Sequence, residues 1–522
     1  MLGDNVHVKQ RLSTRDWFVS HVSMTVLATS LMSLGAVAIG WLPPIYNLAA
    51  HPALEALRAT SAGQVLGRTA VIVGGALLVH TWLVLGITIL RDNTVSTGQL
   101  YRLLSMSLAP LLIAPPLFSR DVYSYIAQGR LVILGLNPYD NGVGSVPGWF
   151  GLGADPMWAE SPTPYGPFFI MLQAGIASLT PQSPTTAVIL YKLVCLVGLA
   201  LMATGVTRLA TFHGISASAA LWLAVLNPLV IVHLFMGLHN DGLMIGILLW
   251  SFVVALQRRP LWAIALLVLA TGVKPIAAIA LPFVVLASLP AHHSLKQRWF
   301  GWIAGSIGLL AGLSLLGWWN GLGFGWVGSL STPGSVATLL SPTTAVAEII
   351  GIVTRLFDVE TYGLILGPLR LIGLTAAIAL AALLALRPEG RPAVRSAAYA
   401  LTAIVGLSPV VQPWYLLWAL PFVAVVGLSR PWHLRTIVAG TAFFIIYSLS
   451  EVNVVTDSTI DGSDYFSIAL SALIVIVIAI ASPRERSLVL GTQYSSGLLP
   501  DADSLQTAQQ MIVRKDVPHV AS

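Results

Sequence analysis

Long apolar runs separated by short polar segments make up most of this 522-residue chain. A helix needs roughly 20 mostly apolar residues to cross the hydrocarbon core of a bilayer, and runs of that length predict about 12 full spans. They cover residues 17–41, 67–90, 101–118, 186–207, 216–235, 241–257, 299–319, 362–386, 396–411, 413–428, 432–450 and 465–482. The pattern therefore predicts an all-α polytopic membrane protein.

Two apolar stretches do not fit as simple spans. Residues 166–180 form a short run bounded by prolines, and residues 261–289 are too long for one span and are interrupted at Lys274-Pro275. We expect a half-helix in the first stretch and a pair of re-entrant half-helices in the second. Irregular backbone at membrane depth is tolerated only where it is buried in protein or lines a cavity, so both stretches indicate a site nearby.

The composition agrees with lipid as the main solvent. Hydrophobic residues make up 56% of the chain and charged residues only 9%, whereas soluble globular proteins carry roughly 25% charged residues. The mean hydropathy is +0.82. A single cysteine, Cys195, excludes a disulfide-rich secreted scaffold. The net charge of +6 comes from basic residues scattered between apolar runs, so a nucleic-acid-binding surface is not indicated.

The distribution of charge predicts an orientation, because lysine and arginine favour cytoplasmic loops. With a cytoplasmic N-terminus, most basic residues fall in the predicted inner loops and most acidic residues face outside. Treating residues 166–180 as a full span would move Arg208, Arg258 and Arg259 outside, so the half-helix is favoured. Both termini are then predicted to be cytoplasmic.

The outer loop after the third predicted span contains a distinctive polar pattern. In helical phase Asp121, Tyr125 and Gln128 share one face, while Val122 and Ile126 lie on the opposite face. These two faces predict an external amphipathic helix that lies along the outer interface with its apolar face toward lipid.

Two interpretations of Asp121 are open from these residues. Ser119 is a suitable N-cap, which places Asp121 in the first helical turn, where it complements the helix dipole and can pair with Arg120. Alternatively, Asp121 is a general base at the lipid–water boundary, where an acceptor hydroxyl can meet a lipid-linked donor.

The rest of loop 119–185 is rich in prolines and aromatic residues. Prolines define turns, and the aromatic rings can either stack on sugars or form an interfacial belt. The candidates for substrate contact in this loop are Arg120, Tyr123, Tyr125, Gln128, Arg130, Asn137, Tyr139 and Tyr165.

A polar triplet, His239-Asn240-Asp241, stands at the start of the sixth predicted span. Asn240 or Asp241 can act as a helix N-cap. Three adjacent polar groups at the membrane edge are costly, however, which favours a functional site. A metal site would need further ligands, and no HExxH or DxD motif lies near the triplet.

Two lysines and one turn are the remaining candidates for the functional site. Lys274 lies at the break between the half-helices and Lys192 at the start of a span; each either pairs with an acid or backbone carbonyls, or binds a phosphate. Gln412, Trp414 and Tyr415 lie in a turn between two spans. Interfacial anchoring explains the two aromatic rings, while Gln412 favours contact with a sugar or lipid.

Four motifs together resemble one family of membrane enzymes. The loop reads SRDVYSY-x-AQGR-x6-NPY and is followed by TPYGP, by HND at a helix start and by a QPWY turn. This set is similar to the actinobacterial polyprenyl-phosphomannose-dependent α-(1→6)-mannosyltransferases of lipomannan assembly (MptB-like), in the GT-C class of membrane glycosyltransferases. The likeness extends from about residue 17 to 482, and SRDVYSY and HND are its most specific parts.

The resemblance implies an inverting glycosyltransferase with a GT-C-like bundle and a site on the external, periplasmic face of the plasma membrane. Its donor would be polyprenyl-phosphomannose, and its acceptor a mannan on a phosphatidylinositol-based glycolipid. Asp121 matches the catalytic aspartate that GT-C enzymes carry in an early external loop. His239, Asn240 and Asp241 would face the site, and Lys274 would bind the donor phosphate.

In this mechanism Asp121 deprotonates the acceptor 6-hydroxyl, which attacks the anomeric carbon and inverts it. The leaving group is a lipid phosphate monoester, whose charge Lys274 or Arg130 would offset. No cofactor is therefore expected. A divalent cation is expected to be dispensable or modest in effect.

The expected organisation has three parts. Residues 1–100 comprise a cytoplasmic N-terminus and two leading spans, which the resemblance implies are an addition to the usual GT-C core. Residues 101–482 form the catalytic module with the external loop 119–185, and residues 483–522 form a polar cytoplasmic tail.

Other functions remain open from the residues alone. A secondary transporter also has many spans and broken helices, but no internal repeat is visible here and most acidic residues gather at one surface. A non-catalytic lipid-binding subunit would show the same loop. Within the enzyme class, only the resemblance selects mannose over arabinose or glucose.

Overall fold

The computed structural model describes residues 14–450, apart from 44, 47–48, 93, 291, 336–337, 389 and 429, and this part of the chain contains helices and no strands. The first half comprises α1 (Thr14–Ile39), α2 (Pro52–Ala59), α3 (Ser61–Asp92), α4 (Thr97–Leu108), α5 (Asp121–Ile133), α6 (Pro167–Leu179), α7 (Pro184–Phe212), α8 (Ala217–Ala224) and α9 (Asp241–Leu256). The second half comprises α10 (Pro260–Val273), α11 (Leu281–Ser288), α12 (Leu295–Trp319), α13 (Gly325–Gly328), α14 (Pro342–Arg355), α15 (Tyr362–Leu386), α16 (Ala393–Leu407), α17 (Leu416–Val426) and α18 (Pro431–Ser450). Short 3-10 or π turns that matter below are η1 (Ala109–Leu112), η4 (Val230–Met236), η5 (Pro275–Ala280) and η7 (Pro413–Tyr415).

The number of full spans differs from the prediction. Within residues 14–450, six helices are long and apolar enough to cross a membrane: α1, α3, α7, α12, α15 and α18. A seventh is counted if η4 and α9, which meet at 109°, form one bent span. The polytopic helical class is therefore supported, but the expected count of about 12 spans is not confirmed. The predicted span 465–482 and the tail 483–522 lie outside the described residues.

Helix breaks explain two of the differences from the predicted count. The predicted span 216–235 stops at Ala224, and a new π-helical turn begins only at Val230, after Asn227-Pro228. The predicted span 101–118 stops as an α-helix at Leu108 and tightens into η1. Proline cannot donate the helical hydrogen bond and clashes with the preceding turn, so apolar length alone overestimates these spans.

The two predicted interruptions are present. The apolar run after Gly166 is α6, a helix of 13 residues. The second stretch divides at Lys274 into α10, which ends at Val273, and η5 with α11, which begin at Pro275. The start of α6 and the end of α10 lie next to each other: the Gly166 amide donates a hydrogen bond to the Val273 carbonyl at 3.2 Å.

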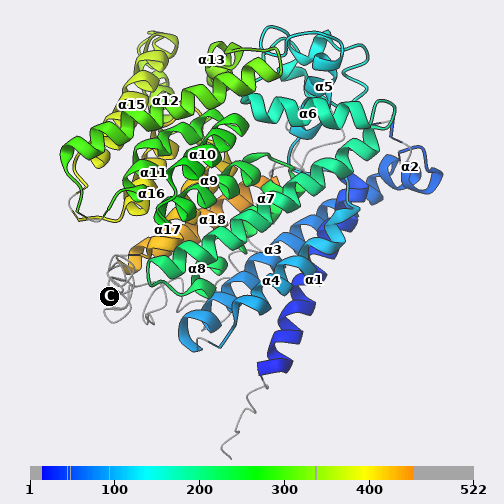
Figure 1. Ribbon diagram of the computed structural model, residues 1–522. Coiled ribbons are helices and arrows are strands. Elements are labelled where there is room, and N and C mark those ends of the chain that lie inside the picture. The colour runs from blue at the N-terminus through cyan, green and yellow to red at the C-terminus, as the bar shows by residue number, and fades with distance from the viewer. Residues whose placement is uncertain are drawn as a thin grey trace, which may run out of the picture.

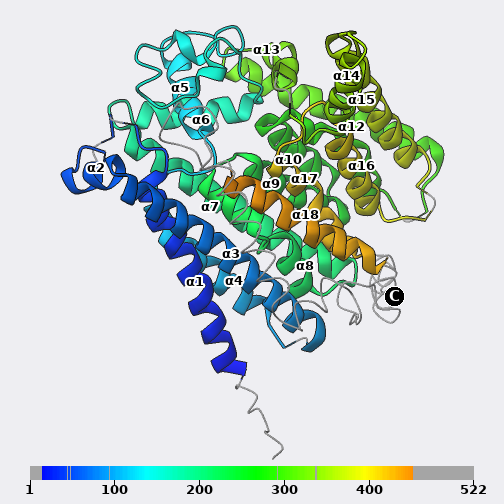
Figure 2. The same cartoon turned by 180° about the vertical axis from the view of Figure 1, so that it is seen from behind.

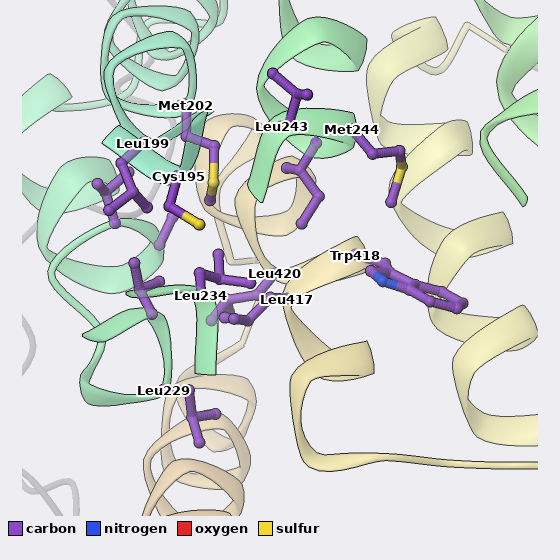
Figure 3. Packing of buried hydrophobic residues seen from close by; sticks show 14 of the residues in the cluster. Cys195, Leu199, Met202, Leu229, Leu234, Leu243, Met244, Leu417, Trp418 and Leu420 are labelled. Carbon is purple, nitrogen blue, oxygen red and sulfur yellow. The ribbon is translucent and has the colours of Figure 1, made fainter. Parts of the chain in front are cut away.

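The helices form a bundle with a cap at one end (Figures 1 and 2). Helices α1 and α3 run side by side, α9 packs between α7 and α10, and α5 with α6 and the long loop after α5 lie at the capped end. Apolar side chains from α7, α9 and α17 pack together inside the bundle (Figure 3). On the side of the bundle away from α1 and α3 (Figure 1), α12 and α15 expose large apolar side chains such as Trp318 and Leu371, as expected for helices that face lipid.

Helix α5 is present where it was predicted, but its surroundings correct the prediction. Every residue from Val122 to Gly129 is buried, so the face that carries Val122 and Ile126 packs into the protein and does not lie against lipid. Helix α6 packs against the other face, where Phe169 contacts Tyr125 and Gln173 donates to Gln128, so both faces of α5 lie within the protein. The side-chain pattern of an amphipathic helix is the same for burial in protein and for burial in lipid, so the sequence could not separate them.

Lys192 is bound to backbone carbonyls, which was one of its two predicted roles. Its Nζ donates to the carbonyl oxygens of Leu111 (2.8 Å), Leu112 (2.8 Å) and Ala114 (2.5 Å), at the end of η1. The side chain is only 5% exposed. Lys192 therefore satisfies the carbonyls that a helix end leaves unpaired.

We expect Lys192→Met to lower the stability of the folded protein. Methionine keeps the apolar stem but donates no hydrogen bond, so buried carbonyls lose their partner at a cost of roughly 1–3 kcal/mol each. The measurement is the melting temperature of the detergent-solubilised protein. The matched control is Lys296→Met, which removes an exposed lysine from the first turn of α12 and should leave the melting temperature unchanged. An unchanged melting temperature in Lys192→Met would contradict the structural role.

Candidate active site

Four segments that are distant in the sequence meet beside the cap: the start of α5, the start of α9, the break between α10 and η5, and the turn η7. Two hydrogen bonds between backbone groups fix parts of this arrangement, one joining the approaches to α5 and α9 and one joining the start of α6 to the end of α10. The Leu117 amide donates to the Met236 carbonyl at 3.0 Å, and the Gly166 amide donates to the Val273 carbonyl at 3.2 Å. The polar ends of these segments therefore face one another.

Asp121 lies in the first turn of α5 and is paired with His239. The His239 Nδ1 is 3.1 Å from the Asp121 Oδ2, and the side chains are 1% and 23% exposed respectively. Arg120 occupies the N-cap position, so the prediction of Ser119 as the N-cap is displaced by one residue. The Ser119 hydroxyl nevertheless accepts a hydrogen bond from the Asp121 amide at 3.1 Å. The carboxylate is therefore held at Oδ2 by His239, while the side chain remains partly exposed.

The imidazole of His239 is stacked on the indole of Trp414. Their ring centroids are 3.7 Å apart and the planes differ by 21°. Trp414 comes from η7, so the predicted QPWY turn lies beside the predicted HND triplet. Stacking of this kind restricts the imidazole to one plane.

A second ion pair lies beside the first. The Lys274 Nζ donates to both carboxylate oxygens of Asp241, at 2.7 and 2.9 Å, and the Trp418 Nε1 donates to the Asp241 Oδ1 at 2.5 Å. Asp241 is fully buried, whereas the Lys274 side chain is 15% exposed. Lys274 therefore pairs with an acid, which was one of its predicted roles.

Aromatic rings surround the ammonium of Lys274. Its Nζ lies 5.4 Å from the ring centroid of Trp418, 5.6 Å from that of Tyr415 and 5.9 Å from that of Tyr165. Contacts in this range add cation–π attraction. An ammonium has three N–H donors, and Asp241 takes two of them, so one donor remains for a ligand.

Close backbone contact brings Tyr165 to this position. A Cβ atom on Gly166 would lie 2.6 Å from the carbonyl oxygens of both Thr271 and Gly272, so only glycine allows the loop to approach α10 here. Tyr165 packs edge-on against Tyr125, with ring centroids 5.3 Å apart. The TPYGP motif therefore joins the loop to the cluster.

Two non-glycine residues with left-handed backbone directly precede the paired segments. Phe118 has φ = 70° and precedes Ser119-Arg120-Asp121, while Leu238 has φ = 54° and precedes His239-Asn240-Asp241. Such a conformation costs on the order of 1–3 kcal/mol at each position and tends to occur at functional sites. The strain supports a functional interpretation of both motifs.

The surroundings of the cluster shift the acidity of its members. Burial would raise the pKa of Asp121, but the hydrogen bond from His239, the electrostatic effect of His239 and Lys274, and the Ser119 hydroxyl together hold that pKa below its ordinary value. Burial raises the pKa of Tyr125 and of Tyr165, and the nearby Asp121 carboxylate raises both further. Asp121 is therefore ionised at neutral pH, and the two phenols are neutral.

Several other predicted residues have structural partners. Arg120 donates to the carbonyl oxygens of Gly153 and Ala154, and stacks over Trp41, with its Cζ 3.7 Å from the ring centroid. Tyr123 is completely buried and donates to the Trp41 carbonyl. These contacts fasten the loop after α5 to the end of α1.

Gln128 and Arg130 face α6. The Gln128 Oε1 accepts from the Gln173 Nε2 at 2.8 Å, and both side chains are buried. Arg130 is nine residues beyond Asp121, or roughly 13 Å along the helix, and its guanidinium lies 3.5 Å from the Pro181 carbonyl. The structure places both away from the Asp121–His239 pair.

The remaining predicted residues support the cluster from outside. The Asn137 Oδ1 accepts from the Tyr139 amide at 3.0 Å, and the Tyr139 hydroxyl donates to the Tyr165 carbonyl at 3.0 Å. The Gln412 carbonyl accepts from the Tyr415 amide at 2.9 Å, which starts η7. Asn240 occupies the N-cap position of α9, and both polar atoms of its buried side chain have no hydrogen-bond partner among the described residues.

Trp418 belongs to the cluster but was not predicted. It follows Trp414 by four residues, so the helical repeat places both indoles toward α9, and that spacing was the available signal. No three His, Cys, Asp or Glu side chains within the described residues are arranged to share a metal ion.

Two models of one protein family match this chain. The family model described as alpha-(1->6)-mannopyranosyltransferase, N-terminal domain, matches residues 22–290, and the model of the MptB C-terminal domain matches residues 343–484. No solved structure matches.

Curated relatives agree with the family models. A probable alpha-(1->6)-mannopyranosyltransferase of Mycolicibacterium smegmatis is 36% identical over 66% of this chain and 67% of its own length. Alpha-(1->6)-mannopyranosyltransferase A of Corynebacterium glutamicum is 32% identical over 56% of this chain and 65% of its own length. A Mycobacterium tuberculosis alpha-(1->6)-mannopyranosyltransferase is 33% identical over 61% of this chain and 63% of its own length. The resemblance predicted from the motifs is confirmed, and the chain belongs to the MptA/MptB family of α-(1→6)-mannopyranosyltransferases.

Proposed function

We propose that this protein transfers mannose, with inversion, from a polyprenyl-phosphate donor to a hydroxyl of a mannan or mannosylated glycolipid, forming an α-(1→6) linkage in lipomannan-type assembly. One observation carries the proposal: Asp121 is ionised, hydrogen-bonded on one oxygen by His239 and still 23% exposed. A carboxylate in that state can accept a proton from an alcohol that approaches its free oxygen. Family membership supports the identity of the sugar and the linkage.

The chemistry requires one bond to form and one to break. The acceptor 6-hydroxyl gives its proton to Asp121 while its oxygen bonds to the anomeric carbon of the donor. The bond between that carbon and the phosphate oxygen breaks, and its electrons leave with the polyprenyl phosphate. Attack opposite the leaving group converts a β-linked donor into an α-linked product.

Lys274 is proposed to stabilise the leaving group. Its third N–H donor is free of Asp241, and its side chain is partly exposed. A polyprenyl phosphate monoester leaves as a dianion, whereas a nucleoside diphosphate would leave as a trianion, so one ammonium can suffice here. For this reason we propose that no cofactor is needed and that a divalent cation is at most a modest activator.

We further propose a plasma-membrane location with the site on the external face. The basic residues of the predicted inner loops support this orientation. Both termini would then be cytoplasmic, with the loop after α5 external.

The expected result is mannosyl transfer by the purified protein in lipid nanodiscs. Labelled polyprenyl-phosphomannose and a short α-(1→6)-mannoside acceptor are supplied, and the linkage of the product is read by NMR. Transfer should persist after chelation of divalent cations, because Lys274 supplies the positive charge.

The controls test separately which donor is used, which sugar is transferred and whether the protein is a glycosyltransferase. GDP-mannose should not serve as donor, and polyprenyl-phosphate carriers of arabinose or glucose should react far more slowly. No transfer by folded protein with an intact donor would contradict the proposal. Activity with another sugar would retain the enzyme class and correct the substrate.

A further inference from the structure

The imidazole of His239 has two nitrogens in very different environments. Its Nδ1 lies 3.1 Å from the Asp121 Oδ2, whereas its Nε2 is buried and has no hydrogen-bond partner among the described residues. Because an ionised carboxylate can only accept, the hydrogen of this contact is carried by Nδ1. The hydrogen bond to Asp121 is therefore the polar contact that the ring makes.

Three features hold the ring in this orientation. Trp414 stacks on one face, with centroids 3.7 Å apart. On the edge, a Cβ atom at Gly237 would lie 3.1 Å from the His239 Cδ2 and 3.3 Å from its Nε2, so glycine leaves room for the imidazole. The His239 amide donates to the His233 carbonyl at 3.3 Å, just after the left-handed Leu238.

The neighbouring His233 does not extend the Asp121–His239 pair into a proton relay. Its ring centroid is 6.2 Å from that of His239, and its Nε2 is 2.9 Å from the Ser448 hydroxyl. No described group accepts from the Nε2 of His239. The hydrogen-bonded pair thus ends at the imidazole, which fits a residue that orients a carboxylate better than one that passes a proton onward.

We infer that His239 is a positioning residue for the transfer reaction: its Nδ1–H binds the Asp121 Oδ2 and so directs the other carboxylate oxygen, Oδ1, toward the acceptor hydroxyl. This inference rests on the proposed function and adds to it the orientation of the base. Trp414 and Gly237 contribute by keeping the imidazole in place.

Two substitutions distinguish the nitrogens. The side-chain amide of His239→Asn reaches the place of Nδ1–H and can still donate to Asp121, whereas that of His239→Gln reaches the place of Nε2 and cannot. We expect His239→Asn to retain kcat within about 10-fold of wild type, and His239→Gln to lose about 100-fold or more, within the range of general base catalysis. The KM for the donor should change little in either variant.

The pH profile supplies a second readout. Asp121 is faced by His239, Lys274, Tyr125, Tyr165 and Tyr415. His239 holds the pKa of Asp121 down, and a base must be unprotonated to act, so losing the hydrogen bond moves the acid limb of kcat to higher pH. We expect that displacement in His239→Gln and none in His239→Asn, whose amide keeps the hydrogen bond to Asp121.

The assay is run in nanodiscs with the whole 522-residue chain, and melting temperatures are measured in parallel. If His239→Gln fails to fold, two variants of Trp414 replace it. Trp414→Phe keeps a ring that can stack on the imidazole and Trp414→Leu does not, so the loss of kcat is expected in the second variant. Equal loss in folded Asn and Gln variants, or a rise in donor KM at unchanged kcat, would overturn the inference. An infrared titration of the Asp121 carboxylate needs no substrate: a pKa raised in His239→Gln but not in His239→Asn is expected even if wild type proves inactive toward this donor, and an unshifted pKa would overturn the inference independently of the proposed function.

Discussion

Asp121→Asn is expected to reduce mannosyl transfer by about 10²- to 10⁴-fold, the range that loss of a general base produces, while leaving the fold intact. Asparagine has nearly the same shape as aspartate, and its amide oxygen can still accept from the His239 Nδ1 at the position of Oδ2. The amide cannot take a proton from the acceptor hydroxyl, however. The loss should therefore fall on kcat, with little change in the KM for either substrate.

The measurement is the initial rate of transfer in nanodiscs, with the melting temperature recorded for each variant. Asp358→Asn is the matched control, because Asp358 is an exposed acid at φ = 57°, a backbone conformation that asparagine also tolerates. This control should transfer mannose at the wild-type rate. If folded Asp121→Asn also does so, Asp121 is not the base, and the chemistry must be assigned to another group.

The segments of this site could be predicted from the sequence, but their pairing could not. Asp121, the HND triplet and Lys274 each stand at a helix start or break, which local rules of capping and proline placement reveal. Asp121 and His239 are 118 residues apart. Nothing local indicates that this histidine, and not the adjacent Asn240, reaches the carboxylate, because the choice depends on how α5 and α9 pack.

The limits of the fold prediction have the same origin. Apolar runs and proline breaks located α1, α3, α7 and both halves around Lys274. The face of α5 that carries Val122 was assigned to lipid because an apolar stripe does not indicate what covers it, whereas Val122 and Ile126 are buried within the protein. Trp418 was missed because its partner, Asp241, is 177 residues away.

Removal of Lys274 is expected to have two separable effects. In Lys274→Met, the completely buried Asp241 keeps only the Trp418 donor, and breaking a buried ion pair by deleting one partner costs roughly 3–5 kcal/mol. A loss of activity in this single variant would therefore not distinguish donor binding from instability. The melting temperature of Lys274→Met should fall clearly below that of wild type.

The double variant Lys274→Met with Asp241→Asn separates the two effects. Asparagine carries no charge that needs a partner and can still accept from Trp418, so the melting temperature should recover much of the loss. If the third N–H of Lys274 binds the donor phosphate, the KM for polyprenyl-phosphomannose should stay raised by roughly 10- to 100-fold, the value of one charge-assisted hydrogen bond. Lys192→Met, which removes a lysine that donates to backbone carbonyls at the end of η1, should lose stability without a change in that KM. Recovery of both stability and donor KM in the double variant would reduce Lys274 to the structural partner of Asp241, and the charge of the leaving group would then need another source.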